Sequence, residues 1–250
     1  MKPLQDRTAI ITGGGRGIGK AIAHAYSKAG ANVVLIGRTP QPIEDAAGEI
    51  TAAGGSALAI PADVSRDEDI ARIVDATLRR FAAIDVLVNN AAIIPASQNL
   101  VDNDPATWRE VIAVNLVAPA MLIKAVLPGM IARRSGRIIN ISSIGGRAGG
   151  RGRSAYRASK AGLINLTQSV AAEVKAHGID VNCICPGGVD TEGLWESIGR
   201  VQKLDRDTLI DPAEIAEVAL FLASAAGSSI TGTAIDAFGL SNPIFRDRKS

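Results

Sequence analysis

The feature that most constrains the fold is a regular alternation between short, wholly apolar segments and longer segments with helical periodicity. Residues 8–12 form the first apolar segment, and a glycine-rich stretch, a helical pattern and a second apolar segment at 32–36 follow. Segments that are apolar on both faces are typical of parallel strands covered by helices on each side. The alternation therefore predicts a Rossmann-type, doubly wound α/β fold with a parallel sheet and helices on both faces.

The same alternation continues through the rest of the chain. We expect about seven strands, at residues 8–12, 32–36, 57–60, 84–88, 137–141, 179–184 and 234–237. We expect helices at residues 20–29, 43–53, 66–81, 105–133, 154–176 and 211–223. Pro119 should bend or interrupt the fourth helix. Because there is no internal repeat, low-complexity tract or linker, residues 1–250 are interpreted as a single domain.

Charge and hydropathy exclude several classes of protein. The 250 residues carry 27 lysines and arginines against 25 acidic residues, a balance that argues against a dedicated nucleic-acid binder. No wholly apolar run approaches the roughly 18 residues of a membrane span. The N-terminus leads directly into a strand-like segment without a signal-peptide core, and we expect no membrane partner.

Cys183 and Cys185 are the only cysteines of the chain. At alternate positions of a strand they share a face, yet they diverge too far for easy bridging. We interpret them as buried thiols rather than a redox or metal pair, so we expect a cytoplasmic protein and no metal site.

The glycine-rich stretch has the spacing Gly13-x-x-x-Gly17-x-Gly19 and lies between a strand and a helix. In this arrangement backbone N–H groups and a helix N-terminus can meet a phosphate. The spacing differs from the more widespread G-x-G-x-x-G, and glycines are also common in turns. The loop alone therefore leaves nucleotide binding open.

Two arginines indicate which dinucleotide such a loop would bind. The position about 20 residues beyond the glycines contacts the adenosine ribose, and an acid there favours NAD. Here that position is Gly37, followed by Arg38, while Arg16 lies inside the loop. Two guanidinium groups suit a 2′-phosphate, so we predict NADP and keep NAD as possible. The alternative is that both arginines are solvated surface charges.

Tyr156 and Lys160 follow a loop rich in glycine and arginine, which ends at Ser154, a residue type that favours a helix N-cap. Four residues apart on a helix, the two side chains share a face. An ammonium group near a phenol favours phenolate, so we expect a lowered tyrosine pKa and a general acid or base. Surface helices also carry such pairs by chance. However, Asp63, Asn89 and other polar residues likewise follow predicted strands, where α/β sheets bind ligands.

Taken together, these motifs resemble those of the single-domain short-chain dehydrogenases/reductases along nearly the whole chain. The matching positions are Thr12, Gly13, Gly17, Gly19, Asp63, Asn89, Asn90, Ala91, Asn115, Ser143, Tyr156, Lys160, Pro186, Gly187 and Thr191. The resemblance implies an enzyme that interconverts a ketone and a secondary alcohol by hydride transfer. An oxoacyl-reductase-like ketoreductase is the favoured activity, and an NAD-dependent sugar or polyol dehydrogenase is the alternative. A non-catalytic NADP-binding regulator is a remote alternative.

The resemblance also implies roles for residues. Tyr156 exchanges a proton with the substrate oxygen, Ser143 binds the same oxygen, Lys160 depresses the tyrosine pKa and holds the ribose, and Asn115 keeps a helix kink and a proton-relay water. Residues expected to contact the coenzyme are Thr12, Gly13, Gly15, Arg16, Gly17, Ile18, Gly19, Arg38, Asp63, Val64, Asn89, Ala91, Tyr156, Lys160, Pro186, Gly187, Val189 and Thr191. Asp63 would meet the adenine edge, Asn89 and Ala91 the adenosine and ribose side, and Thr191 the nicotinamide carboxamide.

The substrate would be a small molecule covered by a lid at about residues 187–210, as in the family. Trp195 either closes over the substrate or packs under its own loop, and Ile93 is a candidate for the opposite wall. Arg147, Arg151 and Arg153 enrich the loop before Tyr156 and are typical of carboxylate or phosphate recognition. A solvated basic loop is the preferred interpretation, and Arg153, three residues before Tyr156, is the strongest single candidate for anion recognition.

The chain departs from the family pattern at two places, and one predicted helix carries an apolar stripe. Ala92 replaces a glycine common in the family, which should affect only local packing. The C-terminal residues Phe238, Ile244 and Phe245 are too apolar for a free tail, so we expect them at a subunit interface or near the pocket. A stripe of apolar residues on the 154–176 helix, with the family's usual pairing of helices, predicts a homodimer or homotetramer. The stripe consists of Leu163, Leu166, Val170 and Val174.

Overall fold

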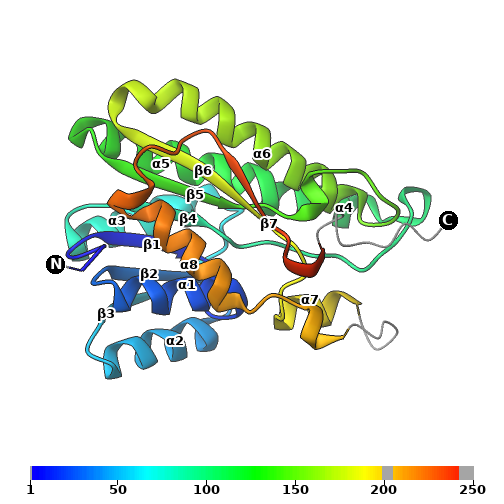
Figure 1. Ribbon diagram of the computed structural model, residues 1–250, viewed down its shortest axis with the longest axis horizontal. Helices are drawn as coiled ribbons and strands as arrows, with labels where there is room; N and C mark the ends of the chain where they lie inside the picture. Colours follow the sequence, from blue (N-terminus) through cyan, green and yellow to red (C-terminus); the bar gives the residue numbers. More distant parts are fainter. Residues whose placement is uncertain (1, 199–204, 242–250) are drawn as a thin grey trace.

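A computed structural model of the chain describes residues 2–198 and 205–241. Its centre is a sheet of seven parallel strands in the order β3-β2-β1-β4-β5-β6-β7 (Figure 1). The strands are β1 (Thr8–Thr12), β2 (Asn32–Gly37), β3 (Ser56–Pro61), β4 (Val86–Asn89), β5 (Gly136–Ile141), β6 (Ile179–Pro186) and β7 (Ala234–Ala237). The predicted strands are therefore confirmed to within two residues at either end.

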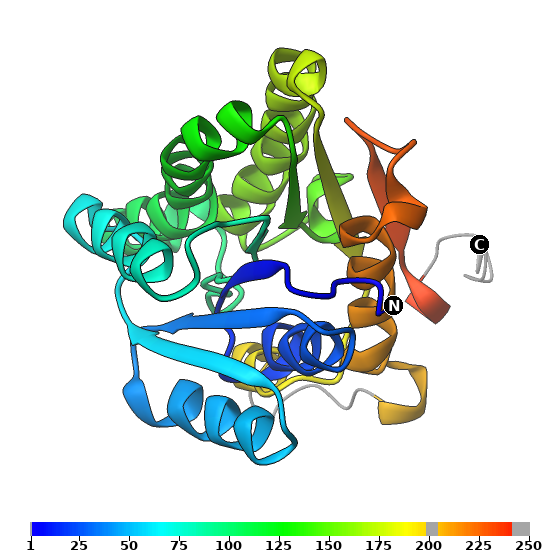
Figure 2. The same cartoon turned by 90° about the vertical axis from the view of Figure 1, so that its left-hand side faces the viewer.

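The helices connect these strands and cover both faces of the sheet. They are α1 (Gly17–Lys28), α2 (Pro40–Ala52), α3 (Asp67–Phe81), α4 (Pro105–Ile112), α5 (Ala118–Arg133), α6 (Ser154–Val174), α7 (Glu192–Ile198) and α8 (Pro212–Ala223). Helices α1, α2 and α8 pack on one face, and α3, α5 and α6 pack on the other. Figures 1 and 2 show α1 and α8 side by side over the middle of the sheet. This arrangement confirms the doubly wound α/β fold.

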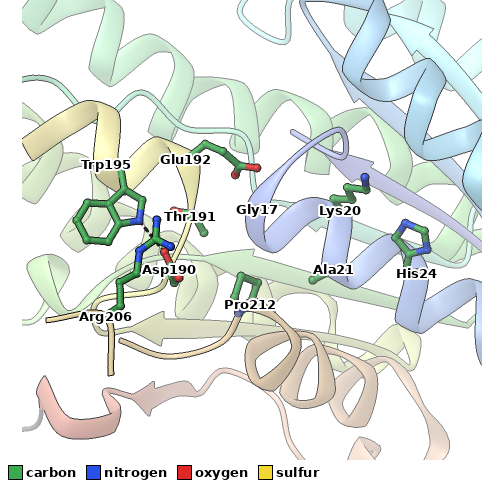
Figure 3. Close-up of a pocket in the computed structure, with 10 residues that line it drawn as sticks. All are labelled: Gly17, Lys20, Ala21, His24, Asp190, Thr191, Glu192, Trp195, Arg206 and Pro212. Atoms are coloured by element: carbon green, nitrogen blue, oxygen red, sulfur yellow. Dashed lines mark hydrogen bonds between the residues drawn. The ribbon is translucent and has the colours of Figure 1, made fainter. Parts of the chain in front are cut away.

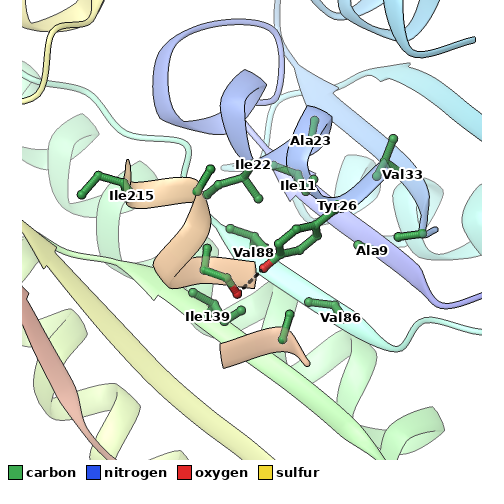
Figure 4. Close-up of a cluster of buried hydrophobic side chains, with 14 of the residues drawn as sticks. Ala9, Ile11, Ile22, Ala23, Tyr26, Val33, Val86, Val88, Ile139 and Ile215 are labelled. Atoms are coloured by element: carbon green, nitrogen blue, oxygen red, sulfur yellow. Dashed lines mark hydrogen bonds between the residues drawn. The ribbon is translucent and has the colours of Figure 1, made fainter. Parts of the chain in front are cut away.

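The two cores arise from alternating residues of the same strands. On β1, Ile11 faces the α1, α2 and α8 side, whereas Ile10 faces the opposite core. Every second side chain of a strand points to the same face, so a strand covered on both sides must be apolar throughout. Tyr26 of α1 is fully buried in the first core, and its hydroxyl donates to the Ala219 carbonyl at 2.9 Å (Figure 4). The buried phenol hydroxyl therefore has a hydrogen-bond partner although no water reaches it.

The stretch Pro105–Arg133 is one continuous helical path with a π-helical turn, Ala113–Val117, between α4 and α5. Pro119 occupies the first turn of α5, where its missing N–H is tolerated, so the interruption lies just before the proline. An 18-residue window of this stretch has a mean hydropathy of 2.0, which is apolar enough to cross a membrane by length and composition. It packs on the sheet through buried residues such as Leu122, Val126 and Met130, as a core helix does.

Two sequence-based expectations about α6 need correction. The helix begins at Ser154, and its N-cap is Arg153, which has a left-handed backbone with φ +54°; Ser154 is therefore not the cap. The apolar stripe is mostly internal, because Leu163, Val170 and Val174 are at most 7% exposed. The stripe packs on the sheet of its own chain and does not form an outer surface.

Strand order reverses between β1 and β4, because β2 and β3 extend to one side of β1 and β4 to β7 to the other. At such a point the loops at the carboxyl ends of the two central strands diverge and leave a crevice. The glycine-rich loop follows β1, and Asn90 follows β4. The fold thus places both at the crevice.

Candidate active site

A cleft of about 1090 Å³ runs along the carboxyl ends of the strands. Its lining joins the glycine-rich loop and Arg38 at one part to Ser143, Tyr156 and Lys160 at another. Most residues expected at the site lie along it. They are Gly13, Gly15, Arg16, Gly17, Ile18, Arg38, Asp63, Val64, Ala91, Ile93, Ser143, Arg153, Tyr156, Lys160, Pro186, Gly187, Val189 and Thr191.

The glycine-rich loop is held tightly against its neighbours. Gly13 has a left-handed backbone, φ +65°, and a Cβ on Gly19 would collide with the Gly13 carbonyl oxygen. The side-chain amide of Asn90 donates to the carbonyl oxygens of Thr12 at 2.8 Å and Gly13 at 3.2 Å. Glycines at these positions therefore let the chain turn sharply and leave backbone N–H groups near the N-terminus of α1, a geometry that suits a phosphate.

Thr12 and Asn89 support the cleft from outside its lining. The Thr12 hydroxyl accepts from the backbone N–H of Asn90 at 2.9 Å and of Ala91 at 3.0 Å, and so ties β1 to the end of β4. Asn89 is 3% exposed and donates to Asn140 Oδ1 at 2.9 Å, which places it inside the sheet. Neither residue lines the cleft, whereas Asn90 does, and the expected contact of Thr12 and Asn89 with the coenzyme stays a prediction.

Asp63 ends the β3 side of the cleft. Its carboxylate accepts from the Ser65 N–H at 2.9 Å and hydroxyl at 2.7 Å, and its own N–H donates to Asp69 Oδ2 at 2.7 Å. Val64 lies beside it in the lining. These contacts fix the loop and leave Asp63 at the cleft, as expected.

Lys160 lies at the floor of the cleft and is 2% exposed. Its ammonium donates to the Ile141 carbonyl at 2.7 Å and lies 5.7 Å from the centroid of the Tyr156 ring. Burial lowers the pKa of this lysine from 10.5 to about 8. The ammonium thus remains mostly protonated at neutral pH although it is out of water.

The pKa of Tyr156 departs from the expectation. Desolvation raises it above its usual value, while the Ser143 hydroxyl and the Arg153 and Arg157 guanidinium groups oppose that rise. The lysine ammonium is directed to a backbone carbonyl and lies over the ring, so it does not offset the desolvation as the sequence predicted. In this structure the phenol is therefore protonated at neutral pH, the form that donates a proton.

Ser143 and Asn115 position the surroundings of Tyr156. The Ser143 hydroxyl accepts from the Gly145 N–H at 3.0 Å and lies in the lining of the cleft. Asn115 is fully buried in the π-helical turn; its oxygen accepts from the Ile93 N–H at 2.8 Å, and its amide donates to the Ile93 carbonyl at 3.0 Å. Asn115 thus lies outside the lining and holds Ile93, which is in it.

The two arginines at the coenzyme end each pair with a glutamate. Arg16 Nη1 lies 2.6 Å from Glu196 Oε1, and Arg38 Nη1 lies 3.6 Å from Glu110 Oε1. All four side chains are more than half exposed, so these ion pairs are weak and exchangeable. Both guanidinium groups line the cleft, where a phosphate can reach them.

Helix α7 lies within the segment expected to form a lid, of which residues 199–204 fall outside the described residues. Trp195 of this helix does not line the cleft. Its indole N–H donates to Asp190 at 2.6 Å and Arg206 stacks on its ring at 5.1 Å, in an adjoining pocket of about 440 Å³ (Figure 3). The structure therefore corresponds to the alternative in which Trp195 packs with its own loop.

The three loop arginines have different environments. Arg147 pairs with Asp236 at 2.6 Å and donates to the Ala234 carbonyl, which fixes the loop to β7. Arg151 is exposed and does not line the cleft. Arg153 does line it, and its Nη2 donates to the carbonyl oxygen of Ser197 in α7 at 2.9 Å.

Cys183 and Cys185 are free, buried thiols, which confirms that prediction. Phe238 is 9% exposed and packs with both cysteines, close behind the cleft, whereas Ile244 and Phe245 lie outside the described residues. Among residues 2–198 and 205–241, no group of three His, Cys, Asp or Glu side chains could hold a metal ion.

Sequence reasoning missed several residues of the lining. Arg157 lines the cleft one helical turn beyond Arg153, and Ser142 and Glu196 contribute as well. The position of Arg157 next to Tyr156 was a signal that could have found it. Glu196 gave none, because only the fold of α7 brings it to Arg16.

The comparisons with known proteins agree with this geometry. The family model described as short chain dehydrogenase matches residues 7–200. A cis-4-hydroxycyclohexanecarboxylate dehydrogenase from Sinomonas cyclohexanicum is 39% identical over 91% of this chain and 93% of its own. A solved putative NAD(P)-dependent gluconate 5-dehydrogenase from Beutenbergia cavernae, with bound NADP, is 38% identical over 95% of this chain and 97% of its own, with a TM-score of 0.87.

A solved 3-ketoacyl-(acyl-carrier-protein) reductase from Brucella melitensis, complexed with NADH, is 31% identical over 95% of this chain and 99% of its own, with a TM-score of 0.88. Fold, cleft and relatives define an oxidoreductase that acts on CH–OH groups. The chain belongs to the short-chain dehydrogenase/reductase family.

Proposed function

We propose that the protein is an NADP-dependent reductase that converts a ketone to a secondary alcohol, with Tyr156 as the proton donor. The observation that carries the proposal is the single cleft that joins the glycine-rich phosphate cradle to Tyr156, Ser143 and Lys160. The cradle fits a dinucleotide because its glycines admit a ligand close to the backbone. When bound, NADPH would supply the hydride.

The residues of the chain would handle the proton and the charge. The Tyr156 phenol, protonated at neutral pH, donates a hydrogen bond and then a proton to the substrate oxygen. The Ser143 hydroxyl binds the same oxygen and stabilises the negative charge that develops on it. The raised pKa keeps the Tyr156 phenol protonated, the form that the reductive direction requires, and the Lys160 ammonium lies 5.7 Å from the centroid of its ring.

The preference for NADP rests on Arg16 and Arg38. Both guanidinium groups line the coenzyme end of the cleft, and their present glutamate partners are exposed. A dianionic 2′-phosphate would compete well for both, because charge-assisted contacts to phosphate are stronger than exposed carboxylate pairs. Arg38→Ala should weaken binding of NADPH at least about tenfold more than binding of NADH, as measured by coenzyme fluorescence. Equal losses would contradict the 2′-phosphate assignment.

A second candidate, an NAD-dependent sugar or polyol dehydrogenase, is favoured by one observation. Glu196 and Glu110 already neutralise the two arginines, so the coenzyme end is less positive than the sequence indicates. The relatives include both a reductase named for 3-ketoacyl substrates and a putative gluconate dehydrogenase. The Arg38→Ala comparison separates the two coenzyme assignments.

The experiment that tests the activity is a screen in both directions. NADPH and NADH are offered with ketones, including oxoacyl thioesters, and NADP⁺ and NAD⁺ with sugars and polyols, while nicotinamide fluorescence is followed. NADPH oxidation by at least one class of ketone supports the proposal. Turnover of polyols with NAD⁺ alone supports the second candidate, and coenzyme binding without any turnover would point to a non-catalytic regulator.

We further propose that α7 and the residues around it form a lid, and that the enzyme is a cytoplasmic homodimer or homotetramer. Two unpaired buried thiols fit a reducing compartment. Because the apolar stripe of α6 is internal, self-association would use other apolar positions. One is Val117, at the end of the π-helical turn before α5, which is 48% exposed.

A further inference from the structure

Arg153 occupies an unusual position at the substrate end of the cleft. It caps α6 three residues before Tyr156, and its backbone is left-handed, with φ +54°. A non-glycine residue adopts this conformation at an energetic cost, and such strain clusters at functional sites. The left-handed backbone therefore directs this side chain differently from the extended backbone that is usual at a helix N-cap.

The charge of Arg153 is not balanced by any acid in the described part of the chain. Within residues 2–198 and 205–241, Arg16, Arg38 and Arg147 each have a carboxylate within 4.0 Å, whereas Arg153 has none. Its side chain is partly buried, and desolvation lowers its pKa, with the nearby Arg157 acting in the same direction. A desolvated cation without a counter-charge is costly, so the site favours an added anion.

The hydrogen bonds of the guanidinium leave capacity for such an anion. Nη2 donates to the Ser197 carbonyl oxygen at 2.9 Å and hydroxyl at 3.3 Å. Nε is buried without a partner, and Nη1 makes no hydrogen bond within the described residues. The group lines the cleft, and its charge acts on the pKa of the Tyr156 phenol. An anion held there would thus lie within electrostatic reach of the reacting oxygen.

We infer that Arg153 binds a carboxylate of the substrate, which is therefore a ketone or secondary alcohol that also carries a carboxylic acid. Arg157 also lines the cleft, and its nearby guanidinium adds positive charge around the carboxylate that Arg153 would bind. The same guanidinium holds Ser197 of α7, so carboxylate binding also fixes the position of this helix. The inference rests on the proposed function, because it concerns the substrate of that reaction.

The test measures binding without turnover, so that it is independent of hydride transfer. Two matched pairs of ketone-free probes are titrated by calorimetry into the protein saturated with NADP⁺. The pairs are cyclohexanecarboxylate with cyclohexanecarboxamide, and pentanoate with pentanamide. A hydrogen bond to a charged partner favours the carboxylate of at least one pair by about tenfold to a hundredfold.

Variants assign this preference to Arg153. Arg153→Gln keeps a donor for Ser197 but removes the charge, and should reduce the preference to near one. Arg153→Lys keeps the charge and should retain part of the preference. Arg151→Gln, in the same loop but outside the cleft, should leave the preference unchanged, and thermal unfolding checks that each variant is folded.

Any of three results would overturn the inference. They are equal affinity for carboxylate and amide in both pairs, absence of carboxylate binding at millimolar concentration, and an unchanged preference in Arg153→Gln. Turnover gives a second readout with 4-oxocyclohexanecarboxylate and its amide. If Arg153 only positions α7, Arg153→Gln lowers kcat/KM equally for both, which also contradicts carboxylate binding. Turnover of neutral ketones with no charge preference would leave the proposed reductase intact while the inference fails.

Discussion

At the scale of single residues, Lys160 shows how the cleft retains charge at a cost in stability. Its ammonium is 2% exposed, and its described hydrogen bond goes to the Ile141 carbonyl. Burial lowers its pKa to about 8, so the charged form is penalised but still prevails at neutral pH.

The lowered pKa predicts a pH-dependent stability. Between about pH 8 and pH 10.5 the folded protein releases the Lys160 proton while the unfolded chain keeps it, so the free energy of unfolding rises with pH in this window. Relative to Lys160→Met, the wild type should gain about 2–3 kcal/mol between pH 7.5 and pH 10. Urea unfolding at several pH values measures this difference. Lys28→Met, at an exposed position, is the control, and a pH-independent difference for Lys160→Met would contradict the account.

At the scale of elements, the π-helical turn between α4 and α5 links a core helix to the cleft. It places Asn115, which is fully buried, against both backbone groups of Ile93. An α-helical path through these residues would change the direction of the side chain. The π-helical turn therefore holds Ile93, which lines the cleft after β4, in place.

Removal of the Asn115 amide should destabilise the protein. In Asn115→Ala the N–H and carbonyl groups of Ile93 lose their partners, which costs about 2 kcal/mol or more. Chemical denaturation gives the free energy, and ketone reduction should fall because the wall loosens. Asn165→Ala, on the exposed face of α6, is the matched control; a loss below about 0.5 kcal/mol for Asn115→Ala would show that these contacts carry little energy.

Helix α7 couples the coenzyme end of the cleft to the substrate end. Glu196 pairs with Arg16 at 2.6 Å, while Ser197 accepts from Arg153. Adjacent residues of one short helix thus contact Arg16, which is expected to bind a phosphate, and Arg153, which is proposed to bind a carboxylate. The carboxylate of Glu196 competes with a 2′-phosphate for Arg16.

This competition predicts a coenzyme-selective effect of Glu196→Gln. Because an exposed ion pair contributes about 1 kcal/mol at most, NADPH should bind about twofold to fivefold more tightly while NADH is unaffected. Fluorescence titration of both coenzymes measures the ratio. Glu173→Gln, an exposed change outside the cleft, controls for net charge. Equal gains for NADPH and NADH would show that Arg16 does not meet a 2′-phosphate.

At the scale of the whole molecule, the parallel sheet and the alternation of strands and helices could be predicted from the sequence. Apolar strands and amphipathic helices have distinct periodicities. The glycine-rich loop, Tyr156 and Lys160 could also be predicted, because each belongs to a short motif within one stretch of the sequence. The ion pairs of Arg16 and Arg38, and the burial of Asn89, depend on packing between distant elements. The raised pKa of Tyr156 could not be predicted either, because spacing places Lys160 on the right face without fixing where its ammonium points.

The assembly is also a property of this scale. We expect light scattering to give two or four times the 25.8 kDa mass of one chain. Val117→Lys should shift that mass downward, because it places a charge on a half-exposed apolar position next to α5. A monomer at micromolar concentration would contradict the proposed assembly without affecting the chemistry of the cleft.

The most direct test of the central claim is single-turnover oxidation of NADPH by wild type and Tyr156→Phe with the best ketone from the screen. Phenylalanine keeps the ring and removes only the hydroxyl. The account predicts that the variant binds NADPH with an affinity within about threefold of wild type, and that the rate of NADPH oxidation falls by at least about a thousandfold. A variant that oxidises NADPH at a near-normal rate would show that Tyr156 is not the proton donor.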